Sequence, residues 1–175
     1  MENLRVWIKK ILFNEIVLAI ILALILKAYV MDSRYVPSSS MHPTLQVKDR
    51  LLVNKLAYKF GDIQRGDIII FEPPPSVDSK YDYVKRVVGL PGETVAVKQG
   101  VVYIDGKALD ESYVNETPLY EFQPAKVPDG SLFVLGDNRN HSFDSHLWIE
   151  WLSISDVKGK VFFRYWPLDR IGRVN

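Results

Sequence analysis

Cysteine is the residue type that the 175-residue chain lacks altogether. Without thiols the chain can form no disulfide scaffold, no cysteine nucleophile and no cysteine-ligated zinc or iron–sulfur site. An excess of one charge is also lacking, because 22 basic residues stand against 21 acidic ones, so no overall field attracts nucleic acid. No fixed-period repeat occurs, which excludes solenoids and propellers. The remaining composition, 47% hydrophobic and 25% charged, is that of one globular domain with room for an appendage.

One long apolar run lies near the N-terminus, where residues 16–26 (IVLAIILALIL) contain no polar side chain. The wider segment 11–31 is interrupted only by Asn14, Glu15 and Lys27. As a helix it would span roughly 31 Å, the thickness of the hydrocarbon core of a bilayer. We therefore predict a transmembrane anchor at 11–31 rather than a buried core helix. A cleavable signal peptide is disfavoured, because residues 27–31 (KAYVM) lack a small-x-small cleavage pattern.

The basic residues before this segment predict its orientation. Arg5, Lys9 and Lys10 precede the apolar run, and positively charged flanks tend to stay in the cytoplasm. The predicted organisation is a cytoplasmic segment at 1–10, the anchor at 11–31 and an extracytoplasmic domain at 32–175.

Beyond the anchor, the chain consists of short β-branched and aromatic runs separated by turn signals, with no helical period longer than about two turns. Asp105-Gly106 is a two-residue hairpin signal. The pattern predicts a mainly β fold, an antiparallel sandwich or partly open barrel behind one N-terminal transmembrane helix. Residues 110–127 are polar and irregular, and are predicted to form an insertion or lid. The predicted strands are Arg50–Asn54, Asp67–Phe71, Tyr83–Val88, Thr94–Lys98, Val101–Ile104, Ser131–Leu135 and Val161–Tyr165.

The first of three polar segments that could carry chemistry is 38–45 (SSSMHPTL). Serines between prolines are usually a plain loop. The functional alternative makes one serine a nucleophile on a tight turn whose backbone N–H groups stabilise an oxyanion. About nine residues separate Met31 from Ser40, so the serine would lie within ~30 Å of the membrane surface.

The second segment is 83–93 (YVKRVVGLPGE). Strand alternation places Tyr83, Lys85 and Val87 on one face and Arg86 on the other. The segment could be an edge strand with solvated charges. Alternatively, Lys85 is buried and loses its proton to act as a base, which lysine can do and arginine cannot.

The third segment is 136–146 (GDNRNHSFDSH), which follows an apolar strand. It could be a structural loop in which Asp137 and Asp144 pair with Arg139. It could also bind a metal through these aspartates with His141 or His146, although the zincin spacing is absent. A Ser-His-Asp triad built on Ser40 is a further alternative, and spacing alone does not decide among the three.

Taken in order, an anchor followed by SMHPTL, RGDIIIF, KRVVGLPGE and GDNR…S.DS resembles the type I signal peptidases over residues 3–165. The resemblance implies a membrane-bound serine endopeptidase that removes N-terminal signal peptides from exported preproteins after small-x-small sequences. It implies no cofactor and no metal. The implied partners are signal peptides of secreted preproteins and the lipid bilayer, with no nucleic acid. The implied location is the cell membrane, as a single-pass protein, or the thylakoid membrane.

The resemblance also assigns roles to individual residues. Ser40 matches the nucleophile and Lys85 the general base. Ser38 matches the residue whose hydroxyl joins the Ser40 backbone N–H in the oxyanion hole, and Ser142 matches the serine that orients the lysine amine. The family's charged positions that brace the site from behind are matched in this chain by Asp137, Arg139 and Asp144.

The chain departs from the family pattern GDNRDNSxDSR, because Asn140, His141 and His146 stand where Asp, Asn and Arg are usual. His146 offers Asp144 only a pH-dependent partner. Val36 and Met41 are candidates for lining the substrate pockets. Two rival interpretations from other classes remain. A Ser-Lys self-cleaving repressor would need an N-terminal helix-turn-helix in place of the apolar segment, and a non-enzymatic tethered β module would use the motifs structurally.

Overall fold

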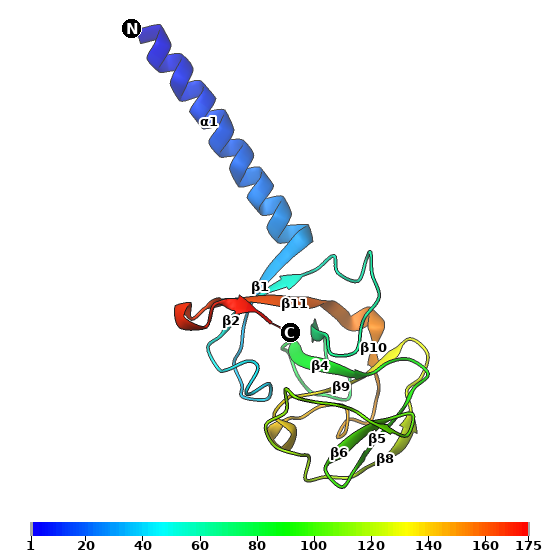
Figure 1. Ribbon diagram of the computed structural model, residues 1–175. Helices are drawn as coiled ribbons and strands as arrows, with labels where there is room; N and C mark the ends of the chain where they lie inside the picture. Colours follow the sequence, from blue (N-terminus) through cyan, green and yellow to red (C-terminus); the bar gives the residue numbers. More distant parts are fainter. Residues whose placement is uncertain (1, 175) are drawn as a thin grey trace.

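The computed structural model describes the backbone of residues 2–174 and the side chains of residues 14–174. The chain begins with helix α1 (Glu2–Ile25), which passes into a short π-helical turn, η1 (Leu26–Val30). Figure 1 shows α1 projecting away from the β domain. Within residues 14–174, no helix combines the length and the apolar composition of a membrane span. Residues 11–13 of the predicted anchor lie outside the described side chains, and Met31, its predicted last residue, opens the first strand.

The remainder of the chain is built from short strands and 3-10 turns. The strands are β1 (Met31–Tyr35), β2 (Arg50–Asn54), β3 (Ile68–Phe71), β4 (Tyr83–Gly89), β5 (Thr94–Lys98), β6 (Val101–Ile104), β7 (Lys107–Ala108), β8 (Phe122–Lys126), β9 (Ser131–Leu135), β10 (Leu152–Ser153), β11 (Val157–Trp166) and β12 (Gly172–Arg173). The 3-10 turns are η2 (Arg139–His141), η3 (Ile154–Asp156) and η4 (Leu168–Arg170).

The strands form two sheets in which every described pairing is antiparallel. The larger sheet has the order β1-β2-β11-β3-β4-β9-β10, with β12 on β11, and the smaller has the order β7-β6-β5-β8. The prediction of a mainly antiparallel β domain is confirmed. The hairpin predicted at Asp105-Gly106 joins β6 to β7, with φ of 49° and 77° at the two turn residues, as a type I′ turn requires.

The prediction for residues 110–127 is wrong at its C-terminal end. Residues Phe122–Lys126 form β8, which pairs with β5, and Val127 is fully buried in the core cluster beneath the smaller sheet. The sequence of this strand, FQPAK, gives no strand signal, because it has a proline and little alternation. Proline is tolerated in a strand at a sheet edge, which is the position that β8 occupies.

Strand β4 is central, between β3 and β9. The edge-strand interpretation of residues 83–93 is therefore wrong, and its basic pair is not solvated: Lys85 is 4% and Arg86 2% exposed. Lys85 lies opposite Ile69 of β3, and the Lys85 amine is 5.5 Å from the centre of the Tyr83 ring on the same face, as the alternation predicts. Two side chains that could carry charge thus enter the protein interior on opposite faces of one strand.

Candidate active site

Ser40 lies on a loop that is fixed by its apolar residues and by backbone hydrogen bonds. Met41 and Leu45 are fully buried in the core cluster that also contains Val36 of the incoming chain. Because Leu45 N–H donates to the Met41 carbonyl at 2.8 Å, the chain turns tightly after Ser40. The loop is also tied to the next motif, since Asn138 N–H donates to the Ser40 carbonyl at 3.0 Å.

Lys85 reaches this serine from β4. Its Nζ donates a hydrogen bond of 2.7 Å to Ser40 Oγ, across 45 residues of sequence. Burial lowers the pKa of Lys85 from 10.5 to about 8, against the opposing effect of the negative charges of Asp144 and Asp137, which raise it. Desolvation outweighs the two carboxylates because the ammonium has almost no contact with water. An appreciable fraction of Lys85 is therefore a neutral amine near neutral pH.

The pair opens into a cleft of about 820 Å³, lined by both Ser40 and Lys85. Ser38 lies on the same wall, with its Oγ 3.4 Å from Ser40 Oγ. Val36 also lines the cleft, whereas Met41 is buried in the core instead. Such a cleft is suited to bind an extended peptide. The serine hydroxyl beside a neutral amine is suited to attack a carbonyl carbon.

The loop after β9 approaches Ser40 so closely that only glycine fits at its start. A Cβ on Gly136 would lie 2.4 Å from the Ser40 carbonyl oxygen and 2.3 Å from Ser142 Oγ. Ser142 is thereby placed beside the loop that carries Ser40, but its Oγ is buried with no hydrogen-bond partner among the described residues. The structure therefore brings Ser142 to the site without a hydrogen bond to Lys85.

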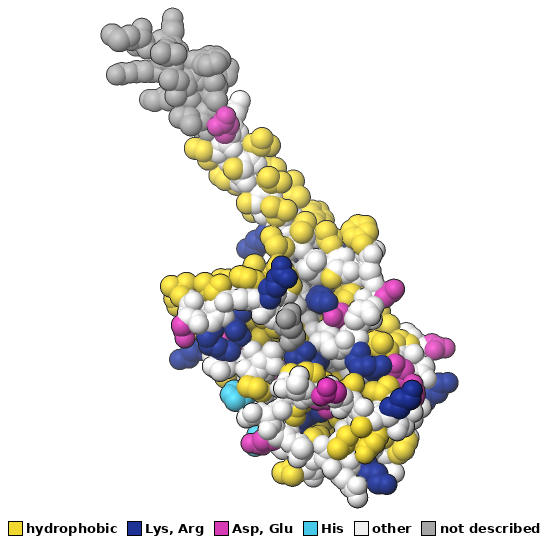
Figure 2. Space-filling view, in the orientation of Figure 1, with side chains coloured by type: hydrophobic (Ala, Val, Ile, Leu, Met, Phe, Trp, Pro, Cys, Tyr) yellow, Lys and Arg dark blue, Asp and Glu magenta, His cyan; other side chains and the backbone are white. Residues whose placement is uncertain are grey.

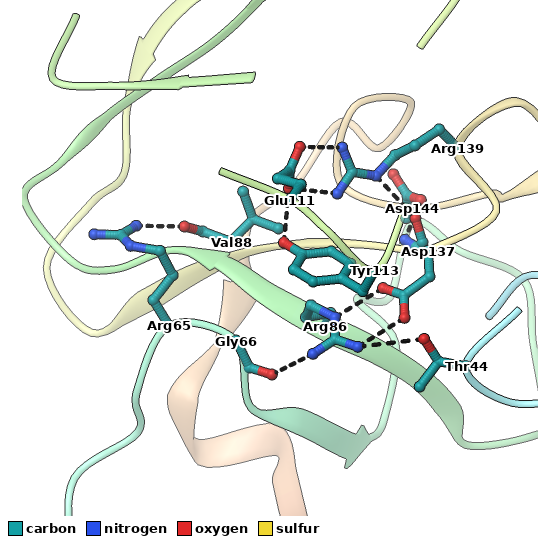
Figure 3. Close-up of polar contacts among 11 residues, drawn as sticks. Thr44, Arg65, Gly66, Arg86, Val88, Glu111, Tyr113, Asp137, Arg139 and Asp144 are labelled. Carbon is teal, nitrogen blue, oxygen red and sulfur yellow. Dashed lines mark hydrogen bonds and ion pairs between the residues drawn. The ribbon is translucent and has the colours of Figure 1, made fainter. Parts of the chain in front are cut away.

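The charged residues predicted to brace the site are all buried, and two of them have partners that differ from those expected (Figure 3). Asp137 receives two hydrogen bonds of 2.8 Å from Arg86, whose third nitrogen donates to the Gly66 carbonyl at 2.8 Å. Arg139 instead pairs with Glu111, at 2.7 and 2.5 Å. The interpretation that pairs Arg139 with Asp137 and Asp144 is wrong, because each of the two arginines has its own carboxylate.

Asp144 is fully buried and is hydrogen-bonded through both of its oxygens. One accepts from Gly136 N–H at 2.9 Å, and the other lies 2.6 Å from His146 Nδ1. The His146 ring stacks on Tyr120, with centroids 3.8 Å apart and the planes 8° from parallel. His146 is therefore the partner of Asp144 at the position where the family pattern has arginine. Burial, together with the negative charge of Asp144, raises the pKa of Tyr120.

The other chemistries considered from sequence find less support in this geometry. The described side-chain partners of Ser40 Oγ are Lys85 and Ser38, and neither is a histidine. His141 is exposed and lines the cleft. His146 does not line the cleft, and its ring is bound to the Asp144 carboxylate. Among residues 14–174, no group of three acidic or histidine side chains is close enough together to hold a metal ion.

Two residues at this site were not found from sequence, Glu111 and Tyr113. They lie in the segment predicted to be a lid, yet Glu111 pairs with Arg139 and the Tyr113 ring lies 3.9 Å from the Arg86 guanidinium. No spacing signal points to them, because 28 residues separate Glu111 from Arg139. The only available signal is chemical, since two buried arginines require carboxylates and aromatic faces nearby.

Comparison with known proteins finds a matching family model, sequence relatives and a solved structure. The family model described as signal peptidase, peptidase S26, matches residues 7–166. The chain is 46% identical over 162 residues to a probable signal peptidase I-2 of Synechocystis sp., covering 91% of this chain and 74% of that protein. It is 36% identical to thylakoidal processing peptidase 1 of Arabidopsis thaliana, covering 87% of this chain and 47% of that protein. A solved signal peptidase I of Enterococcus faecalis is 36% identical, with a TM-score of 0.49, covering 57% of this chain and 97% of that chain.

Proposed function

Because the chain belongs to the signal peptidase family, peptidase S26, we propose that it removes signal peptides from exported preproteins with Ser40 as nucleophile and Lys85 as general base. The observation that carries this assignment is the hydrogen bond of 2.7 Å between Ser40 Oγ and Lys85 Nζ. A serine hydroxyl needs an adjacent base before it can attack a peptide bond. Lys85 is the base within reach, and burial lowers its pKa to about 8.

The mechanism follows from this pair. Neutral Lys85 accepts the hydroxyl proton of Ser40 as Oγ attacks the scissile carbonyl carbon. The Ser38 hydroxyl and the Ser40 backbone N–H stabilise the developing oxyanion. Protonated Lys85 then delivers the proton to the leaving amine, and afterwards activates the water that hydrolyses the acyl-enzyme. Ser142, in this proposal, orients the amine through its buried hydroxyl, which has no hydrogen-bond partner among the described residues. Asp137, Arg139 and Asp144 hold the loop behind the dyad.

The proposed substrate sequence is small-x-small before the cut. The lining of the cleft that contains Ser40 includes the apolar side chains of Val36, Ile70 and Val84, and apolar lining favours apolar substrate side chains over charged ones. Relatives include a Synechocystis signal peptidase and an Arabidopsis thylakoidal peptidase. This range supports a membrane location, at the cell membrane or the thylakoid.

We further propose that residues 11–31 anchor the enzyme in the membrane, with 1–10 cytoplasmic and 32–175 on the other side. On the described part of α1, Ile16, Leu18 and Leu24 are 57%, 66% and 60% exposed. Figure 2 shows hydrophobic side chains along the length of this described part. Apolar area on that scale is stabilised when lipid covers it. Anchoring would also hold enzyme and substrate in one bilayer, raising their effective concentration.

The test is cleavage of a preprotein with an Ala-x-Ala site by the full chain in lipid vesicles. Wild type is expected to release the mature protein, and Ser40→Ala and Lys85→Ala to release none. Lys85→Arg is the matched control, because it keeps a cation at this position that cannot become a base. Activity that survives Lys85→Ala, but is abolished by His146→Ala or by a chelator, would refute the dyad and move the base to a histidine or a metal.

A further inference from the structure

Two buried guanidinium groups, those of Arg86 and Arg139, are contacted by the same short segment (Figure 3). The Arg139 side chain is 0% exposed and pairs with Glu111, which is itself only 11% exposed. The Arg86 guanidinium lies over the ring of Tyr113, 3.9 Å from its centre. Tyr113 OH donates to Glu111 Oε1 at 2.7 Å, joining the two contacts into one unit. We call Glu111 and Tyr113 the clasp.

Each guanidinium that the clasp holds makes further bonds to the loops of the active site. Arg139 Nε donates to the Gly136 carbonyl at 3.1 Å, and Gly136 is the residue whose Cα lies against the Ser40 carbonyl. Arg86 bonds Asp137 through two nitrogens and approaches Thr44 Oγ1 at 3.5 Å, in the nucleophile loop. The clasp therefore contacts the two guanidinium groups directly, and these groups bond Gly136 and Asp137 in turn. Ser40 is one contact further, through Gly136.

We propose that Glu111 and Tyr113 are positioning residues for the cleavage reaction, acting through Arg139 and Arg86 to hold the loop 136–138 against Ser40. The inference rests on the proposed function and deepens it, because it concerns the geometry of the same dyad. The clasp touches no reacting atom. Neither of its residues lines the cleft that contains Ser40 and Lys85.

Burial explains why the clasp has this influence. A guanidinium with no solvent contact cannot be left without a counter-charge. The Glu111 charge and its hydrogen bonds raise the pKa of Arg139 even though burial alone would lower it. Without Glu111, Arg139 would turn toward another carboxylate, and Asp137 and Asp144 are the buried ones in the same loop. Either movement displaces Gly136, and with it the nucleophile loop. A misplacement near 1 Å costs a reaction of this kind about 10²-fold.

The decisive variant is Glu111→Gln, which keeps the shape of the side chain and removes its charge. Glu93→Gln is the matched control, because Glu93 also forms a two-bond pair with an arginine, Arg65, at 2.9 and 2.5 Å. The readouts are kcat, KM and thermal midpoint, measured with a preprotein in lipid vesicles. We expect kcat of Glu111→Gln to fall about 10- to 100-fold with KM within about threefold of wild type. The control, Glu93→Gln, should keep kcat within about twofold of wild type, even if its thermal midpoint falls as far as that of Glu111→Gln.

Tyrosine variants decide the question if Glu111→Gln does not fold. Tyr113→Phe keeps the ring over Arg86 and loses the hydrogen bond to Glu111, whereas Tyr113→Leu loses both. We expect kcat to decrease in the order wild type, Tyr113→Phe, Tyr113→Leu, with KM constant. Equal kcat in wild type and Tyr113→Leu, or in Glu111→Gln and Glu93→Gln, would overturn the clasp as a positioning device. Failure of wild type itself to cleave would instead overturn the proposed function.

Discussion

The titration of Lys85 yields the sharpest prediction. Only the neutral amine can accept the Ser40 proton, so the rate should follow the neutral fraction of Lys85. With its pKa at about 8, about 9% of Lys85 is neutral at pH 7 and about half at pH 8. At the ordinary value of 10.5 the fraction at pH 7 would be about 0.03%, roughly 300-fold lower. We therefore expect kcat/KM to rise about tenfold between pH 6 and 7 and to level off above pH 8.

The assay is the initial rate of preprotein cleavage at low substrate concentration, from pH 6 to 10. A second arm uses Asp144→Asn, which removes one of the negative charges that raise the pKa of Lys85. Because that charge raises the pKa, its removal lowers it, and the acid limb should shift to lower pH. Asparagine keeps an oxygen for the Gly136 N–H. Asp129→Asn, at an exposed turn, is the control and should leave the limb in place.

Three results would refute this reasoning. An acid limb centred near pH 10 would mean that burial does not govern the pKa of Lys85. A limb near pH 6.5 that is lost in a histidine variant would identify an imidazole as the base. A shift of the Asp144→Asn limb to higher pH would show that the carboxylate does not act on Lys85 through its charge.

Three further predictions concern single side chains. Gly136→Ala places a Cβ 2.4 Å from the Ser40 carbonyl oxygen, and we expect kcat to fall by about 100-fold or more, whereas Gly172→Ala, in open space, should cleave normally in the same assay. In Lys85→Met the buried amine is gone. The pKa of Lys85 in the folded state lies below its value in the unfolded state. The free-energy cost of burying the charged amine is therefore complete below pH 8 and vanishes as the pH rises toward 10.5. Urea unfolding should therefore show the variant more stable by about 1–3 kcal/mol at pH 7, with the gain shrinking as pH rises through that window. His146→Arg keeps a donor for its buried carboxylate and should retain kcat/KM within about threefold, whereas His146→Leu should lower the free energy of unfolding by about 1–3 kcal/mol.

Local sequence patterns account for much of the β domain. Strands β2, β5, β6 and β9 have the predicted bounds, because each is a short run of mainly apolar residues that is recognisable without reference to distant residues. Strand β1 has no such pattern, since its sequence MDSRY is mostly polar. It is a strand because it pairs along its whole length with β2, which hydropathy does not reveal.

Motifs point to the predicted site residues, and the structure supplies what motifs omit, namely the partners of buried charges. Alternation separates Lys85 from Arg86 but does not say which face is buried, and both are. Asp137 binds Arg86 across 51 residues, and Glu111 binds Arg139 across 28. Such pairings depend on how sheets and loops pack, and neither a period nor a spacing encodes them.

The pairing of the carboxylates is compatible with the proposed role of Lys85 as base in a site rich in acids. Asp137 and Asp144 lie close enough to raise the pKa of Lys85, yet burial prevails. Asp137 is matched by the full charge of Arg86, and Asp144 is bonded by Gly136 N–H and His146. Each of these donors offsets part of the field of the carboxylate at the amine. The acids can therefore hold the loop against Ser40 without holding a proton on Lys85, so the counter-charges that brace the loop also keep the base available.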